Sequence, residues 1–256
     1  MEIHELEKQN DLSKILLKIL HGYSKYRLTK EDLKIIKDYI EVLLSDEIYQ
    51  EKEIHGRGKR FRRSPLNEIK VGQALRMIIE YQVAFKSKKG FDKIFEIEYA
   101  LLKVIINANK KFLKMTFVQV DGELNVVFYD EDDKIYYLYG GTNSLIKIDE
   151  IFFTELKNNF ESTVDGLKPI FNEYLDRKLG TFSNNNTQTI TISYKGNFDQ
   201  IQGVDPKYIV FYPAIDSTSA IYPHLLTSVM YFDYDQSLGK QTTFYDTFQI
   251  CPPDGC

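Results

Sequence analysis

Residues 114–151 read KMTFVQVDGELNVVFYDEDDKIYYLYGGTNSLIKIDEI and decide the fold of this chain. Apolar and polar residues alternate in three short segments, which predicts three strands at residues 115–120, 124–129 and 134–139. Asp121-Gly122 joins the first two segments, and a two-residue hairpin loop favours this dipeptide because its backbone angles suit Asp and Gly. Repelling carboxylates at residues 130–133 keep the second turn in water. We therefore expect an antiparallel meander here.

The sequence on either side of the meander differs in its periodicity. Apolar residues three and four apart predict helices over about residues 12–20, 33–44, 69–83 and 91–113. Ser64-Pro65 predicts the start of the third helix, with Ser as the N-cap and Pro at the first helical position. After the meander, residues 145–153 suit a fourth strand or the entry to a helix.

The last hundred residues combine a short helical stretch with further strands. Helices are expected at residues 153–160 and 167–179, followed by a Ser/Asn/Thr loop at residues 181–187 that is the best candidate for a hinge. Alternation then predicts strands at residues 189–194, 208–212, 226–234 and 242–250.

The fold class that follows is α+β, with a helical N-terminal half packed on an antiparallel β-rich C-terminal half made of the meander and a sandwich-like sheet. We expect a helical region at residues 1–113, with a basic loop at 55–63, and a β-rich region at residues 114–256, with a helical insert at about 153–180. No Gly/Pro/Ser-rich linker lies near Lys114, so the alternative is one continuous domain.

The C-terminal strands carry aromatic residues on both alternating faces. Alternation places Tyr231 and Phe244 on one face and Phe232 and Tyr245 on the other. A sheet with one exposed face would be polar there, so this pattern predicts either a closed sandwich core or a surface for a protein partner or self-association. The residues concerned are Tyr208, Phe211, Tyr212, Tyr222, Tyr231, Phe232, Tyr234, Phe244, Tyr245 and Phe248.

Composition favours a cytoplasmic protein that does not enter a membrane. No stretch approaches the roughly 18 apolar residues that a spanning helix needs, and the N-terminus opens acidic and polar, unlike a signal peptide. Two cysteines, Cys251 and Cys256, are too few for a disulfide framework or a cysteine-built metal site. They flank Pro-Pro-Asp-Gly, so they could form a disulfide across a turn or serve as modification sites; the alternative is a frayed terminus with incidental cysteines.

A basic run at residues 57–63 is the sharpest anomaly in the sequence. It holds five cations in seven residues, and the chain's net charge of −4 would be −9 without them. Such a local field attracts phosphate or an acidic surface. The expected anion-binding residues are Arg57, Lys59, Arg60, Arg62 and Arg63, with Phe61 as a stacking group. The alternative is a solvated loop whose cations pair with Glu47, Glu51, Glu53 and Glu68.

A weaker pattern has the outline of a restriction-type nuclease hairpin, in which an acid on one strand and Glu-x-Lys on the next hold a metal ion. Asn125 takes the place of the acid, and Glu155-Leu156-Lys157 lies beyond the next strand. A nuclease of this kind would use Asp121, Glu123, Glu155 and Lys157. An ordinary hairpin with a charged turn is the better interpretation, because short motifs match by chance.

No assembled catalytic motif, cofactor fingerprint or metal-ligand spacing occurs in the sequence, and residues 130–133 lack the pattern of a calcium loop. We therefore expect a non-catalytic cytosolic interaction protein that needs no cofactor. It would bind an anionic partner, most concretely nucleic-acid phosphate, through residues 57–63. The alternatives are the metal-dependent nuclease and a structural subunit of a larger assembly.

Overall fold

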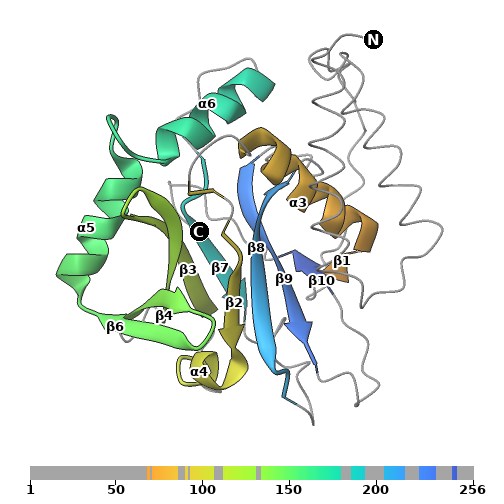
Figure 1. The fold of residues 1–256 in the computed structure, drawn as a ribbon, viewed down its shortest axis with the longest axis vertical. Coiled ribbons are helices and arrows are strands. Elements are labelled where there is room, and N and C mark those ends of the chain that lie inside the picture. The colour runs from red at the N-terminus through yellow and green to blue at the C-terminus, as the bar shows by residue number, and fades with distance from the viewer. Residues whose placement is uncertain are drawn as a thin grey trace.

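A computed structural model of the chain describes residues 68–69, 71–85, 90–91, 93–106, 112–130, 134–179, 186–193, 205–216, 225–234 and 244–246. It contains helices and two antiparallel five-stranded sheets, which confirms the α+β class (Figure 1). The helices expected at residues 12–20 and 33–44 lie outside the described residues. The division into residues 1–113 and 114–256 stays a prediction.

The meander forms as expected and supplies most of one sheet. Its strand order is β6-β5-β4-β3-β7, with β3 at Phe112–Val120, β4 at Glu123–Asp130, β5 at Ile135–Gly141, β6 at Ser144–Ile148 and β7 at Thr189–Ser193. Val120 pairs with Glu123 across the first turn, where Asp121 has φ 51° and Gly122 has φ 78°. These angles belong to a type I′ hairpin turn, which the Asp-Gly dipeptide favours.

The second sheet has the order β1-β10-β9-β8-β2. Its strands are β1 at Glu68–Ile69, β10 at Phe244–Asp246, β9 at Leu225–Asp233, β8 at Tyr208–Asp216 and β2 at Phe95–Glu98. Strands β8 and β9 pair antiparallel along their whole length, from Tyr208 opposite Asp233 to Asp216 opposite Leu225. The strands expected around residues 208–212 and 226–234 are therefore confirmed.

The two sheets share one hydrophobic core, as a sandwich-like arrangement requires. Phe128 of β4 and Phe211 of β8 are both fully buried, and their ring centroids lie 5.3 Å apart. Phe95 of β2 meets Tyr139 of β5 edge-on at 5.3 Å. Because burial of a Phe or Tyr side chain removes 150–250 Å² from water, these contacts between the sheets are a main source of stability.

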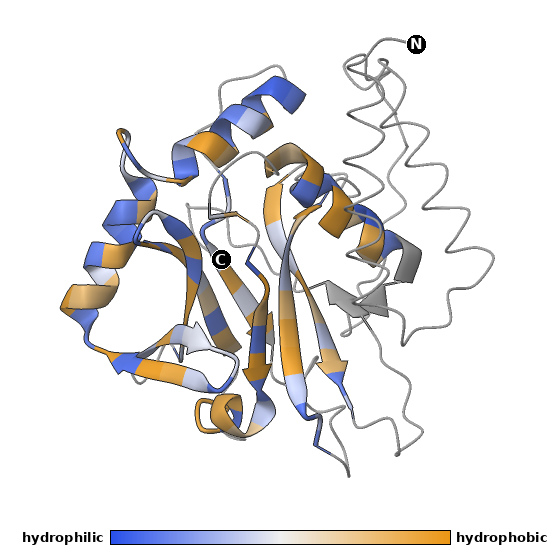
Figure 2. Ribbon diagram, in the orientation of Figure 1, coloured by the Kyte–Doolittle hydropathy of each residue, from blue (hydrophilic) through white to orange (hydrophobic). Residues whose placement is uncertain are grey.

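Helices cover the outer faces of both sheets (Figures 1 and 2). Helix α5 at Glu150–Glu161 places Phe153 in a stack on Tyr136 of β5, at 4.5 Å between ring centroids. Helix α3 at Val71–Phe85 packs on β8, and helix α6 at Lys168–Leu179 contacts α3 through Phe171 and Phe85. The helical stretches expected at residues 153–160 and 167–179 are confirmed as α5 and α6.

The helix expected over residues 91–113 is wrong. Residues 95–98 form β2 and pair with β8, a short helix α4 spans Tyr99–Lys103, and β3 already begins at Phe112. Phe95 and Ile97 are fully buried while Glu98 is exposed. This alternation has the period of a strand. Sequence analysis predicted a helix because the apolar residues of the longer segment are also spaced three and four apart.

The expected helix start at Ser64-Pro65 is also misplaced. Residues 68 and 69 form β1, and α3 begins at Val71. The apolar periodicity from Leu75 to Val83 does belong to this helix. Glu68 and Ile69 pair with β10 and are not part of helix α3. The pairing satisfies backbone N–H and C=O groups that a helix would pair internally.

Four aromatic residues of the strands β8 and β9 are buried. Phe211, Phe232, Tyr231 and Tyr212 are at most 8% exposed. Tyr231 stacks with Tyr212, whereas Phe232 belongs to the core between the sheets, so these neighbours do lie on different faces; the faces predicted for Phe244 and Tyr245 stay a prediction. The alternative of an exposed aromatic surface does not apply to these four residues. No helix in the described part of the chain is long and apolar enough to cross a membrane.

Candidate functional site

The structure describes the chain from Glu68 onward, shortly after the basic run that sequence analysis singled out. The run itself, with Arg57, Lys59, Arg60, Phe61, Arg62 and Arg63, lies outside the described residues. Glu68, five positions after Arg63, opens β1 and pairs with Tyr245 of β10, while Ile69 pairs with Phe244. A five-residue connection spans at most about 17 Å. This limit applies to Arg63, the last residue of the run, relative to Glu68 in β1 at the edge of the second sheet (Figure 1).

The C-terminal cysteines Cys251 and Cys256 lie outside the described residues, as do all four histidines. Their predicted pairing or modification stays a prediction. The described end of the expected hinge, Asn186 and Thr187, is buried at 4% and 3% exposure.

The two acids of the first hairpin, Asp121 and Glu123, have structural roles in the turn and in the packing around it. Asp121 occupies the first turn position, and Glu123 forms an ion pair with Lys93 at 2.7 Å. The backbone N of Leu124 donates to the carbonyl of Gly90 at 2.9 Å. A Cβ at Gly90 would approach the Cα of Glu123 to 2.7 Å, and this glycine also has φ +85°. The hairpin end is thus fixed by close backbone packing and by one ion pair.

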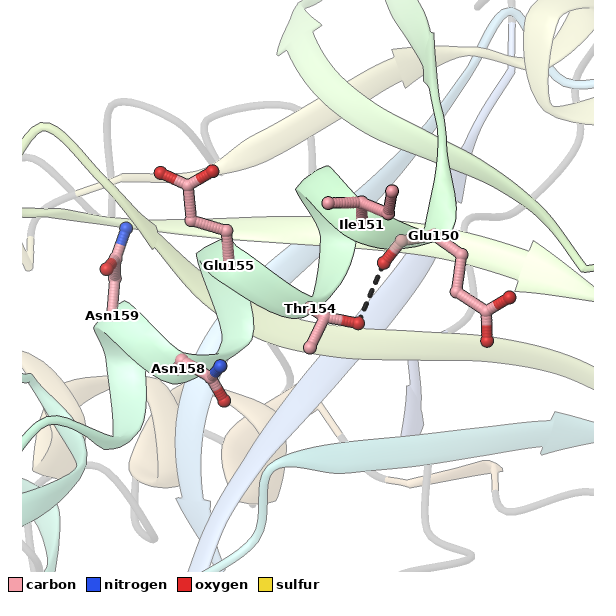
Figure 3. A pocket seen from close by; sticks show the side chains of 6 residues that line it. All are labelled: Glu150, Ile151, Thr154, Glu155, Asn158 and Asn159. Atoms are coloured by element: carbon pink, nitrogen blue, oxygen red, sulfur yellow. Dashed lines mark hydrogen bonds between the residues drawn. The ribbon is translucent and has the colours of Figure 1, made fainter.

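Glu155 and Lys157 lie on helix α5, which alters what their spacing means. In a strand, residues two apart share a face, whereas in a helix they do not. Leu156 between them is buried against the first sheet at 4% exposure. Glu155 lines an open groove along the outer side of α5, and Lys157 is not among the lining residues (Figure 3). The Glu-x-Lys letters therefore do not converge as they would on a nuclease strand.

The described residues contain no group of three or more His, Cys, Asp or Glu side chains that could hold a metal ion. Asp121, Glu123 and Glu155 are all described, so the structure does not bring these three carboxylates together into such a group. Asp121 and Glu123 belong to the β3–β4 turn, and Glu155 stands in the second turn of α5.

The groove on α5 is lined by residues of this one helix. Its lining residues are Glu150, Ile151, Thr154, Glu155, Asn158 and Asn159. The Thr154 hydroxyl donates to the carbonyl of Glu150 at 2.7 Å, so its proton is already used within the helix (Figure 3). Asp149 caps the helix by accepting a hydrogen bond from the backbone N of Phe152 at 2.8 Å. Two carboxylates and two amides on an open face can accept contacts from a polar partner but do not enclose a substrate.

Sequence reasoning missed a buried carboxylate on α3. Glu80 is 5% exposed, and the Tyr174 hydroxyl of α6 donates to its Oε1 at 2.7 Å. The signal was present, since Glu80 stands directly after Ile78 and Ile79 in the middle of an apolar helix. A buried carboxylate is costly without such a partner, so this contact fixes α6 relative to α3.

Among the described groups, four have a raised pKa with a clear cause. Burial raises the pKa values of Tyr99, Tyr136 and Tyr139, and the hydrogen bond to Asp205 raises that of Lys103. Lys103 Nζ donates to Asp205 Oδ2 at 2.7 Å on the surface. All four groups therefore keep their protons at neutral pH, and none of the four is poised as a general base there.

No known protein family, curated protein or solved structure shows significant similarity to the chain.

Proposed function

We propose that this chain is a non-catalytic cytosolic interaction protein that binds an anionic partner through residues 57–63. The observation that carries the proposal is five cations in seven residues, within a chain whose net charge is −4. The positive charge of residues 57–63 attracts anionic partners, whereas the net negative charge of the remaining chain repels them. Nucleic-acid phosphate is the most concrete partner, because Phe61 within the run can stack on an unpaired base.

The anchoring of β1 supports this proposal. Pairing of β1 with β10 joins the chain to the second sheet at Glu68, five residues after Arg63. A tethered basic segment contacts phosphates as a set, and each neutralised phosphate releases condensed counterions. Arg57, Lys59, Arg60, Arg62 and Arg63 are the proposed phosphate contacts.

The direct test is fluorescence-polarisation binding of the full chain to labelled single- and double-stranded DNA and RNA at about 50 and 200 mM salt. Binding that weakens steeply between the two salt concentrations supports the proposal. Absence of binding to every probe at the lower salt concentration would contradict it for nucleic acids.

The metal-dependent nuclease receives no support from the placement of Asp121, Glu123, Glu155 and Lys157. A structural subunit is the second candidate, and one observation favours it. The side chains of Ile146, Ile151 and Phe152 are 49%, 81% and 41% exposed. These three large apolar residues lie within a stretch of seven residues. Apolar exposure of this density is typical of a surface that another chain covers.

A further inference from the structure

We draw no further inference here: the strongest candidate, the open groove on the outer side of α5 together with the exposed side chains of Ile151 and Phe152 at the start of that helix, carries none, because nothing in the described part of the structure shows what covers it.

Discussion

Asn186 accepts a hydrogen bond from the backbone N of Leu226 at 2.9 Å through its side-chain Oδ1. This contact joins the two sheets at one end, because Asn186 precedes β7 of the first sheet and Leu226 is the second residue of β9 in the second. Among the described residues, strand β10 pairs with β9 from Phe244 opposite Tyr231 to Asp246 opposite Val229. The side-chain oxygen of Asn186 therefore accepts the hydrogen bond of the Leu226 backbone N–H, at a position of β9 that lies before the part paired with β10.

Replacing Asn186 by Ala should destabilise the fold by about 2–6 kcal/mol. Its Oδ1 also accepts from the backbone N of Thr187 at 2.9 Å, so the change leaves two buried N–H groups without an acceptor, at about 1–3 kcal/mol each. Urea denaturation followed by circular dichroism measures the difference. Asn158→Ala, on the exposed side of α5, is the control and should change stability by less than about 0.5 kcal/mol. Equal effects would contradict the role given to Asn186.

The strand assignment at residues 95–98 predicts a sharp contrast between two isoleucines. Ile97 is fully buried in the core between the sheets, whereas Ile94 is 43% exposed. Ile97→Ala should lower the free energy of unfolding by about 2–5 kcal/mol, and Ile94→Ala by much less. A helix over residues 91–113 would place both residues on its apolar side, so similar losses in denaturant melts would argue for that helix.

The hydrogen bond between Tyr174 and Glu80 predicts that loss of the Tyr174 hydroxyl lowers the free energy of unfolding more than loss of the hydroxyl of a half-buried tyrosine elsewhere. Tyr174→Phe removes the hydroxyl that donates to the buried Glu80 Oε1, which should cost about 1–3 kcal/mol. Tyr208→Phe, on the half-buried start of β8, serves as the control. The thermal midpoint of each variant reports the difference, and a Tyr174→Phe midpoint equal to that of the unchanged protein would rule out a structural role for this hydrogen bond.

Alkaline pH should destabilise the fold through Tyr136. Burial, followed by the nearby Glu150 carboxylate and Tyr129, raises the pKa of Tyr136 above its ordinary value of 10.0. A raised folded-state pKa gives a contribution that is complete below about pH 10 and is lost as pH rises through the folded-state value. Denaturant titrations at pH 9 and pH 11 should show a smaller drop in stability for Tyr136→Phe than for the unchanged protein. An identical drop would show that Tyr136 does not contribute.

Local chemistry explains which parts of the fold could be predicted from the sequence. Asp121-Gly122 fixes its hairpin within two residues, and the meander around it follows from alternation. Residues 95–98 could not be assigned in the same way, because their neighbours are apolar at both periods and only the distant partner β8 selects the strand. Contacts such as Asn186–Leu226 and Tyr174–Glu80 join residues 40 and 94 positions apart, and no local pattern announces them.

The candidate site was predictable to a different degree. The basic run at residues 57–63 is visible because charge density needs no partner to be recognised. The Glu-x-Lys pattern at Glu155 and Lys157 was misleading because the two residues lie on a helix, where a spacing of two separates side chains. The position of β6 as the last described strand of its sheet could not be read from the sequence, since contacts between distant strands decide the strand order.

The central claim is that residues 57–63 contact phosphate, and the salt dependence of binding tests it most directly. We would compare Arg60→Ala/Arg62→Ala with the control Arg177→Ala/Lys207→Ala, which removes two exposed cations elsewhere, on one double-stranded DNA probe from about 50 to 200 mM salt. The account predicts that only the first variant binds more weakly, with a log–log salt slope less steep by about 1.8. Equal slopes for both variants and the unchanged protein would contradict it.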